Sequence, residues 1–167
     1  MKVHVYERDN INTDEIIPAR YLQMDREEEL APHALEDLDT DFAARVRRGD
    51  AVVAGSNFGC GSSREHAVWA LRGAGVRAVI ADSFARIFYR NCINNGFPAI
   101  VCPGLHKALA NGDEIDIFED AGEIRIRKSG EVRRFIPLPP FARDILRAGG
   151  LMKKIGQELH EQDRRKK

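Results

Sequence analysis

Short apolar runs alternate with helix-patterned segments through the middle of the chain. The runs "AVVAG", "RAVIA" and "PAIVC" occupy residues 51–55, 77–81 and 98–102. Between them lie residues 62–75 and 83–96, which have the pattern of helices that end at glycines. Buried strands that alternate with helices are typical of a parallel sheet with crossover helices. The alternation therefore predicts an α/β fold with a parallel βαβαβ core.

Strand patterns also flank this core. Residues 2–6, "KVHVY", predict an opening strand, and residues 113–119, 123–128 and 131–137 predict three strands joined by short turns. The C-terminal part is therefore expected to be rich in strands. At 167 residues, the chain has the size of one domain spanning 1–167.

Shorter helices are expected at several other places. The tail is expected to be helical from Pro139 and to fray over 158–167. Ser83 is expected to cap the helix at 83–96. The remaining expected helices are pieces within 30–50, the second opening near Asp39 and ending at Gly49, and a short helix at 105–112.

The segment after the first apolar run of the core, residues 55–67, reads "GSNFGCGSSREHA". One interpretation is a capping box, in which Ser62 bonds the amide of Glu65 and Glu65 bonds back to the amide of Ser62. That box leaves the glycines unexplained. The other interpretation is an anion site, since a glycine-rich loop before a helix N-terminus offers free amides and the helix dipole. The loop also follows a parallel strand, where open α/β sheets bind ligands. The two interpretations are compatible.

Known anion and nucleophile motifs narrow the choice of ligand. The loop has no lysine for a phosphate-binding P-loop, and Arg64 stands where a dinucleotide-binding loop needs its third glycine. The nucleophile pattern G-x-S-x-G is absent. Ser62 and His66 lie within one helical turn, which is poor geometry for a hydrolytic triad. A carboxylate ligand fits best, because the guanidinium of Arg64 matches its two oxygens.

Three motifs, "NINTDEIIPARYL", "GSNFGCGSSREHA" and "ADSFARIFYRNCINNGFPAI", together resemble the small subunits of 3-isopropylmalate dehydratase, in the aconitase superfamily. The resemblance covers most of residues 1–105. It implies a β/β/α swivelling domain of the aconitase type, standing alone. It also implies a hydro-lyase that interconverts 2- and 3-isopropylmalate by dehydration and rehydration in leucine biosynthesis.

The resemblance also implies roles for three consecutive residues. Ser62 is the base that removes a proton from the carbon next to a substrate carboxylate, and Ser63 and Arg64 bind a carboxylate of the hydroxy-dicarboxylate substrate. A serine alkoxide is reasonable only if helix amides and Arg64 stabilise its charge. Asn12, Thr13 and Asp14 of the N-terminal motif are expected to order their own loop by side-chain-to-backbone bonds.

Cys60, Cys92 and Cys102 are too widely separated along the chain to predict a cluster site. The resemblance places the [4Fe–4S] cluster on a separate large subunit, so the expected partner is that chain, and no cofactor is expected on this one. A further arginine is expected to complete the site, and Arg20 is a candidate. The cysteines suggest no disulfide framework, so a cytoplasmic protein is expected.

The segment after the N-terminal motif is expected to contact the variable arm of the substrate. Tyr21, Leu22, Gln23 and Met24 carry no positive charge, which favours an isopropyl arm over a carboxylate arm. Homoaconitate and a methylated malate remain alternative substrates. A stand-alone carboxylate-binding domain is the non-enzymatic alternative.

The overall charge and hydropathy argue against two other classes of protein. Acidic and basic residues balance at 26 each, which argues against nucleic-acid binding. No apolar run approaches the roughly 20 residues that a membrane-spanning helix needs.

Overall fold

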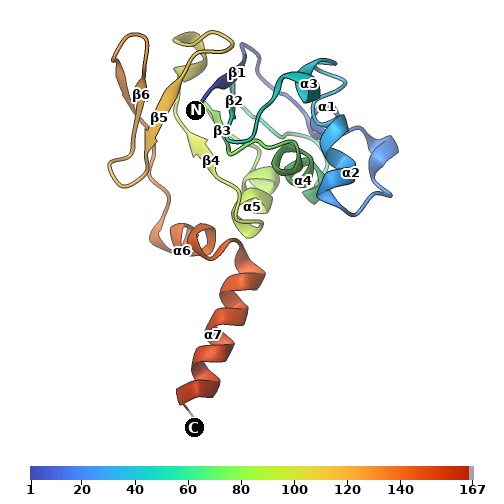
Figure 1. The fold of residues 1–167 in the computed structure, drawn as a ribbon, viewed down its shortest axis with the longest axis vertical. Helices are drawn as coiled ribbons and strands as arrows, with labels where there is room; N and C mark the ends of the chain where they lie inside the picture. The colour runs from blue at the N-terminus through green and yellow to red at the C-terminus, as the bar shows by residue number, and fades with distance from the viewer. Residues whose placement is uncertain (166–167) are drawn as a thin grey trace.

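The computed structural model describes residues 1–165 of the chain (Figure 1). At its centre lie the strands β1 (Val3–Tyr6), β2 (Ala51–Ala54), β3 (Ala78–Ala81) and β4 (Ala99–Val101). They form a parallel sheet in the order β1-β2-β3-β4. The prediction of an α/β fold with a parallel core is confirmed, and the opening strand forms one edge of that sheet.

Both faces of the parallel sheet are buried, because side chains alternate in direction along each strand. Val52 and Val79 pack into the core on the helical side. Val53 and Ile80 pack into the core on the other side. A strand covered on both faces has no solvent-facing positions, which explains why the apolar runs of the sequence show no polar alternation.

The helices of the first hundred residues gather on one side of this sheet (Figure 1). Two of them follow β2 and β3 and serve as crossovers: α4 (Glu65–Gly73) and α5 (Arg86–Asn94). The shorter ones are α1 (Thr13–Ile16), α2 (Glu27–Leu30) and α3 (Phe42–Arg45), with 3₁₀ turns at Ala19–Tyr21 and Ala31–His33. A further 3₁₀ turn, Leu105–Lys107, follows β4, and Leu105 packs into the core on the other side of the sheet.

An antiparallel sheet covers the opposite face. It consists of β5 (Ile115–Phe118), β6 (Glu123–Ile126) and β7 (Val132–Arg134), in that order. Ile115, Ile124 and Ile126 of this sheet are fully buried against the parallel one. The expected strand-rich C-terminal part is therefore present, and its alternating pattern reflects one buried and one exposed face.

Two helices end the chain, α6 (Pro140–Ala148) and α7 (Leu151–Arg165). Ala142 and Ile145 of α6 pack against Ile93 of α5. Figure 1 shows α7 extending away from the rest of the molecule. The helical tail is confirmed, and the expected fraying over 158–167 stays a prediction. Residues 158–165 lie within α7, and residues 166–167 lie outside the described part.

The predicted helix caps at Ser62 and Ser83 are wrong. α4 begins at Glu65 after Arg64, so Ser62 precedes the helix and cannot form the capping box. α5 begins at Arg86, and the hydroxyl of Ser83 instead accepts a bond from the amide of Asn57 at 2.8 Å. In both cases the loop continues two or three residues further than local propensity suggests, because its backbone bonds to neighbouring loops.

Two predicted helical segments are shorter than expected. The segment at 105–112 contains only the 3₁₀ turn Leu105–Lys107. The piece expected from Asp39 to Gly49 is the single turn of α3. A capping box does form at Asn12, whose side-chain oxygen accepts bonds from the amides of Asp14 and Glu15. The prediction that this motif orders its own loop is confirmed for Asn12 only, because the side chains of Thr13 and Asp14 bond to Ser62 and Arg64 instead.

A polar network joins β1 to the segment before α3. The Tyr6 hydroxyl donates to Asp39 at 2.8 Å, and Arg45 donates to the same carboxylate at 2.5 Å. Burial, together with the bond to Asp39, raises the pKa of Tyr6. Burial alone would raise the pKa of Asp39, but the bonds from Arg45 and Tyr6 outweigh it, so that pKa is lowered.

Candidate active site

The glycine-rich loop lies at the carboxyl end of β2, in the position typical of ligand loops in α/β sheets. Gly59 and Gly61 have φ values of +77° and +94°, which other residues adopt only at a cost. A Cβ at Gly59 would also overlap the ring of the buried Phe88 in α5. Glycine is therefore required there by both the backbone and the packing.

The N-terminal motif lies directly against this loop, although some 50 residues separate them in the chain. The amide of Gly59 donates to the carbonyl of Ile11, and the amide of Thr13 donates to the carbonyl of Cys60, each at 2.8 Å. The hydroxyl of Thr13 donates to the carbonyl of Ser62 at 3.1 Å. These bonds from the start of α1 and the residues before it position the end of the loop just before α4.

Ser62, Ser63 and Arg64 occupy that end of the loop. Both serines are exposed, and the Ser62 hydroxyl has no hydrogen bond to another residue within 1–165. The side chain of Arg64 is only 13% exposed and forms an ion pair with Asp14. The guanidinium is therefore held in place by the N-terminal motif.

The start of α4 adds to the positive field around these residues. Within the described chain, its N-cap residue Arg64 makes no side-chain bond to the first turn. The first amides of a helix have no partners inside the helix, and together with the helix dipole they favour a negative charge. Two exposed serines and the oriented guanidinium of Arg64 therefore lie in three consecutive residues directly before a helix N-terminus.

An open cavity of about 580 Å³ adjoins the loop. Gly59 and Gly61 line one side, and Arg86 and Arg90 of α5 line another. Neither arginine was predicted from the sequence as a site residue. Their spacing of four residues places them on the same face of a helix, one turn apart, and that spacing was the available signal.

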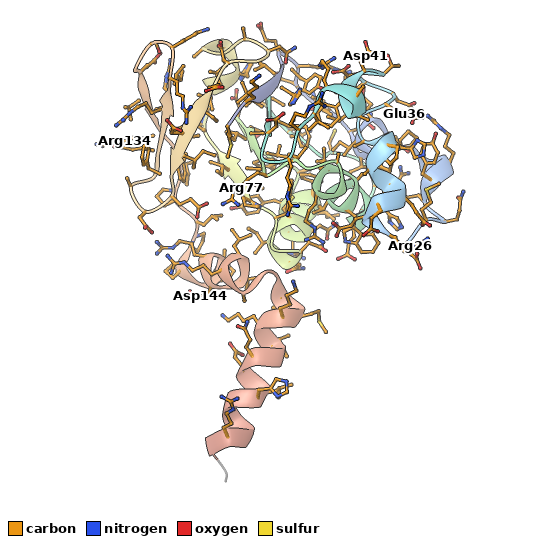
Figure 2. All side chains as sticks on the ribbon, in the orientation of Figure 1. Arg26, Glu36, Asp41, Arg77, Arg134 and Asp144 are labelled. Atoms are coloured by element: carbon orange, nitrogen blue, oxygen red, sulfur yellow. The ribbon has the colours of Figure 1, made fainter. Side chains whose placement is uncertain are left out.

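The candidate residue Arg20 forms its ion pairs away from the serine loop. It forms ion pairs with Glu36 and with Asp37, the latter at 2.7 Å. Its positive charge is therefore already balanced by two carboxylates, on the helical side where Glu36 is labelled (Figure 2). The structure gives Arg20 these partners and does not join it to Ser62.

The segment expected to contact the substrate arm packs mainly inward. The Tyr21 hydroxyl donates to Glu36 at 2.8 Å, and its ring stacks on His33 at 3.7 Å. Tyr21 and Met24 pack against the helical core, Leu22 is half-buried and Gln23 is exposed. Arg64 contacts the carbonyl of Ile17 at 3.5 Å, four residues before Tyr21, so this contact does not join the segment itself to the serine loop.

The cysteines lie apart in the fold. Cys60 is partly exposed in the glycine loop, while Cys92 and Cys102 are buried in different cores. Burial raises the pKa of both buried thiols, which disfavours the thiolate that binds metals. In the described part of the chain, no three His, Cys, Asp or Glu side chains are grouped as metal ligands. These residues do not fit an iron–sulfur cluster.

Comparison with known proteins identifies the family of this chain. A sequence profile described as the Aconitase C-terminal domain matches residues 3–103. A 3-isopropylmalate dehydratase small subunit from Deinococcus deserti is 60% identical over 149 residues, which is 89% of this chain and 82% of that protein. The chain belongs to the family of 3-isopropylmalate dehydratase small subunits. An isopropylmalate/citramalate isomerase small subunit from Methanocaldococcus jannaschii is 49% identical, covering 91% of this chain and 90% of its own length.

A solved structure in this small-subunit family extends the likeness to the C-terminal part. The crystal structure of 3-isopropylmalate dehydratase from Methanocaldococcus jannaschii is 40% identical and superposes with a TM-score of 0.93. It covers 98% of this chain, and 96% of its own length is covered in return. The antiparallel sheet and the terminal helices are thus part of the family fold. Over residues 1–165, no helix is long and apolar enough to cross a membrane.

Proposed function

We propose that this chain is the small subunit of a two-chain hydro-lyase that interconverts 2- and 3-isopropylmalate in leucine biosynthesis. The observation that carries the proposal is the arrangement of Ser62, Ser63 and Arg64. The three residues are consecutive: Ser62 and Ser63 are exposed, and the guanidinium of Arg64 is oriented by Asp14. They directly precede α4, whose first turn receives no side-chain bond from its N-cap residue. The Deinococcus deserti relative, which is named as this enzyme's small subunit, supports the assignment.

Ser62 is proposed as the base. It would accept the proton from the carbon next to a substrate carboxylate, a step that needs a stabilised alkoxide. The amides and dipole of α4 and the guanidinium of Arg64 supply that stabilisation. Because the Ser62 hydroxyl has no hydrogen bond within residues 1–165, it is available for this role.

Ser63 and Arg64 are proposed to bind a substrate carboxylate. The ion pair with Asp14 orients the guanidinium, and its remaining N–H donors are available for a ligand. The substrate carries a second carboxylate. Arg86 and Arg90, at the cavity beside the loop, are better candidates for it than Arg20, whose charge is balanced by Glu36 and Asp37.

A large subunit is proposed to complete the site and to carry the [4Fe–4S] cluster. The described residues of this chain do not fit a cluster, because the three cysteines lie apart and two of them are buried in different cores. Ser62 and Ser63 are exposed, so a second chain can close over them and exclude water. The proposed active site therefore lies at the interface of two chains.

The substrate arm is proposed to be isopropyl, because Tyr21, Leu22, Gln23 and Met24 offer no positive charge. A methylated malate is a second candidate substrate, since the Methanocaldococcus jannaschii relative is named as an isopropylmalate/citramalate isomerase small subunit. A small-subunit role in homoaconitase is disfavoured, because a carboxylate arm would lose its hydration without gaining a partner.

The test is to assay the chain alone and with its cognate large subunit. The pair is expected to convert isopropylmalate, while the isolated chain is expected to be colourless and inactive after anaerobic treatment with iron and sulfide. Stoichiometric iron on the isolated chain would refute the two-chain assignment. Carboxylate binding without any stable complex or turnover would instead support the stand-alone binding domain. Turnover of citramalate or homoaconitate, but not of isopropylmalate, would assign one of the other substrates.

A further inference from the structure

A second cavity, of about 360 Å³, lies at the opposite end of the parallel sheet from the serine loop. Its lining includes Val76 and Arg77, which precede β3, and Phe97 and Pro98, which precede β4. The serine loop follows the carboxyl end of β2. Since all strands of the sheet are parallel, the starts of β3 and β4 lie at the opposite end of the sheet from the carboxyl end of β2.

The floor of this cavity is apolar and belongs to the core. Val76, Phe97, Ile100 and Phe135 all line it, and each is less than a tenth exposed. Leu138 and Leu146, which are half-buried, add a wall from the side of α6. A ligand with an apolar arm would therefore remove hydrocarbon surface from water on both sides of the contact.

The wall beside α6 is held by close backbone contact. Gly96, at the end of α5, has a φ of +67°, and a Cβ there would lie 2.5 Å from the carbonyl carbon of Gly149. Gly150 is bonded through its amide to the carbonyl of Ile145 at 2.9 Å. A Cβ at Gly150 would also lie 2.9 Å from the carbonyl oxygen of Asn94, so the ends of α5 and α6 are packed backbone to backbone.

Four arginines surround the apolar floor. The charge of Arg72 is balanced by Glu27, whose two carboxylate oxygens lie 2.9 Å and 3.0 Å from the Arg72 Nε. Arg147 forms an ion pair with Asp120 at 3.6 Å. Arg77 and Arg143 form no ion pair with any residue in 1–165.

Among the described residues, only one further carboxylate, that of Glu119, lines the cavity. It cannot balance the charges of both Arg77 and Arg143, so positive charge is in excess there. Figure 2 shows Arg77 between the parallel sheet and α6.

We propose that this cavity is a second ligand site, which binds a small organic carboxylate with an apolar arm. The carboxylate would lie between Arg77 and Arg143, and the arm would rest on Phe97 and Phe135. A volume of about 360 Å³ with an apolar lining and a few convergent polar groups is typical of small-molecule sites. The proposal is independent of the catalytic assignment, because this cavity lies at the opposite end of the parallel strands from the serine loop.

The experiment is calorimetric titration of the full-length chain with 4-methylpentanoate. We expect saturable one-site binding of this probe. Acetate, which has no apolar arm, and 4-methylpentanol, which has no charge, should each bind at least about tenfold more weakly, which is about 1.4 kcal/mol. Equal binding of the alcohol and the carboxylate would overturn the role of the arginines.

Three variants test whether the probe binds in this cavity. Arg77→Gln and Arg143→Gln should each weaken binding by about tenfold or more, since each removes a charge-assisted bond. Arg134→Gln is the matched control, because Arg134 lies on the outer side of the antiparallel sheet (Figure 2) and its side chain is 87% exposed. Its affinity should be unchanged. Thermal melts confirm that each variant is folded.

Arg64→Ala distinguishes this site from the catalytic one. The probe should bind this variant as it binds the unmodified chain. If Arg64→Ala abolishes binding and Arg143→Gln does not, the probe occupies the serine loop and the proposal is wrong. An absence of saturable binding to the unmodified chain would also refute it.

Discussion

The replacement Ser62→Ala removes one exposed hydroxyl and tests the proposed base. If Ser62 capped α4, as the sequence predicted, its loss would also cost about 1 kcal/mol of stability, and this loss could be confused with loss of the base. In the structure, Ser62 precedes α4 and its hydroxyl makes no hydrogen bond within residues 1–165. The variant should therefore be as stable as the unmodified chain, within the roughly 0.5 kcal/mol typical of surface substitutions.

The expected loss of activity is large. A positioned general base contributes roughly 10²–10⁴-fold to the rate, which corresponds to about 2.7–5.5 kcal/mol of activation free energy. Ser63 and Arg64 remain in the variant, so the substrate should still bind. The loss should therefore appear in kcat, with little change in KM, because the missing group acts mainly in the transition state.

The assay measures isopropylmalate turnover by the variant, reconstituted with the large subunit. Ser56→Ala is the matched control, because it makes the same chemical change in the same loop, six residues earlier. It should retain kcat. Near-normal turnover in Ser62→Ala would refute the base assignment. A fall in melting temperature would show that the hydroxyl supports the fold instead.

Four further outcomes are expected. Arg64→Lys should lose nearly as much kcat/KM as Arg64→Ala, because lysine cannot form the two-pronged bond to a carboxylate; full activity in the lysine variant would remove that role. Gln23→Arg should shift the ratio of kcat/KM from isopropylmalate towards homoaconitate, measured with both substrates in parallel, and an unchanged ratio would show that this loop does not contact the arm. Gly59→Ala should lower the melting temperature, since it adds strain of about 1–2 kcal/mol at positive φ and a clash with Phe88; an unchanged melt would contradict the packing. The pKa of Asp39 is lower in the folded chain than its unfolded value of 3.8, so the ionised carboxylate stabilises the fold at any pH above 3.8. This stabilisation is lost as the pH falls below 3.8 and through the folded pKa. Asp39→Asn should therefore show a smaller loss of stability on acidification, measured by melting at a series of pH values.

Local pattern was sufficient for the central elements of this fold. The apolar runs at 51–55, 77–81 and 98–102 became β2, β3 and β4, because a strand buried on both faces must be apolar at every position. The helices between them followed from the same argument. Their starting points did not, since Ser62 and Ser83 have cap chemistry but lie in loops whose backbone bonds to other loops.

The candidate site divides in the same way. The residue types at 62–64 and their place after a strand are properties of the sequence alone, and they were enough to predict a carboxylate site, which stays a prediction. The ion pair of Arg64 with Asp14, the bond of Thr13 to Ser62 and the position of Arg86 and Arg90 arise only when distant segments meet. Hydrogen bonds and ion pairs form between neighbours in space, and chain spacing does not reveal those neighbours until the sheet has assembled.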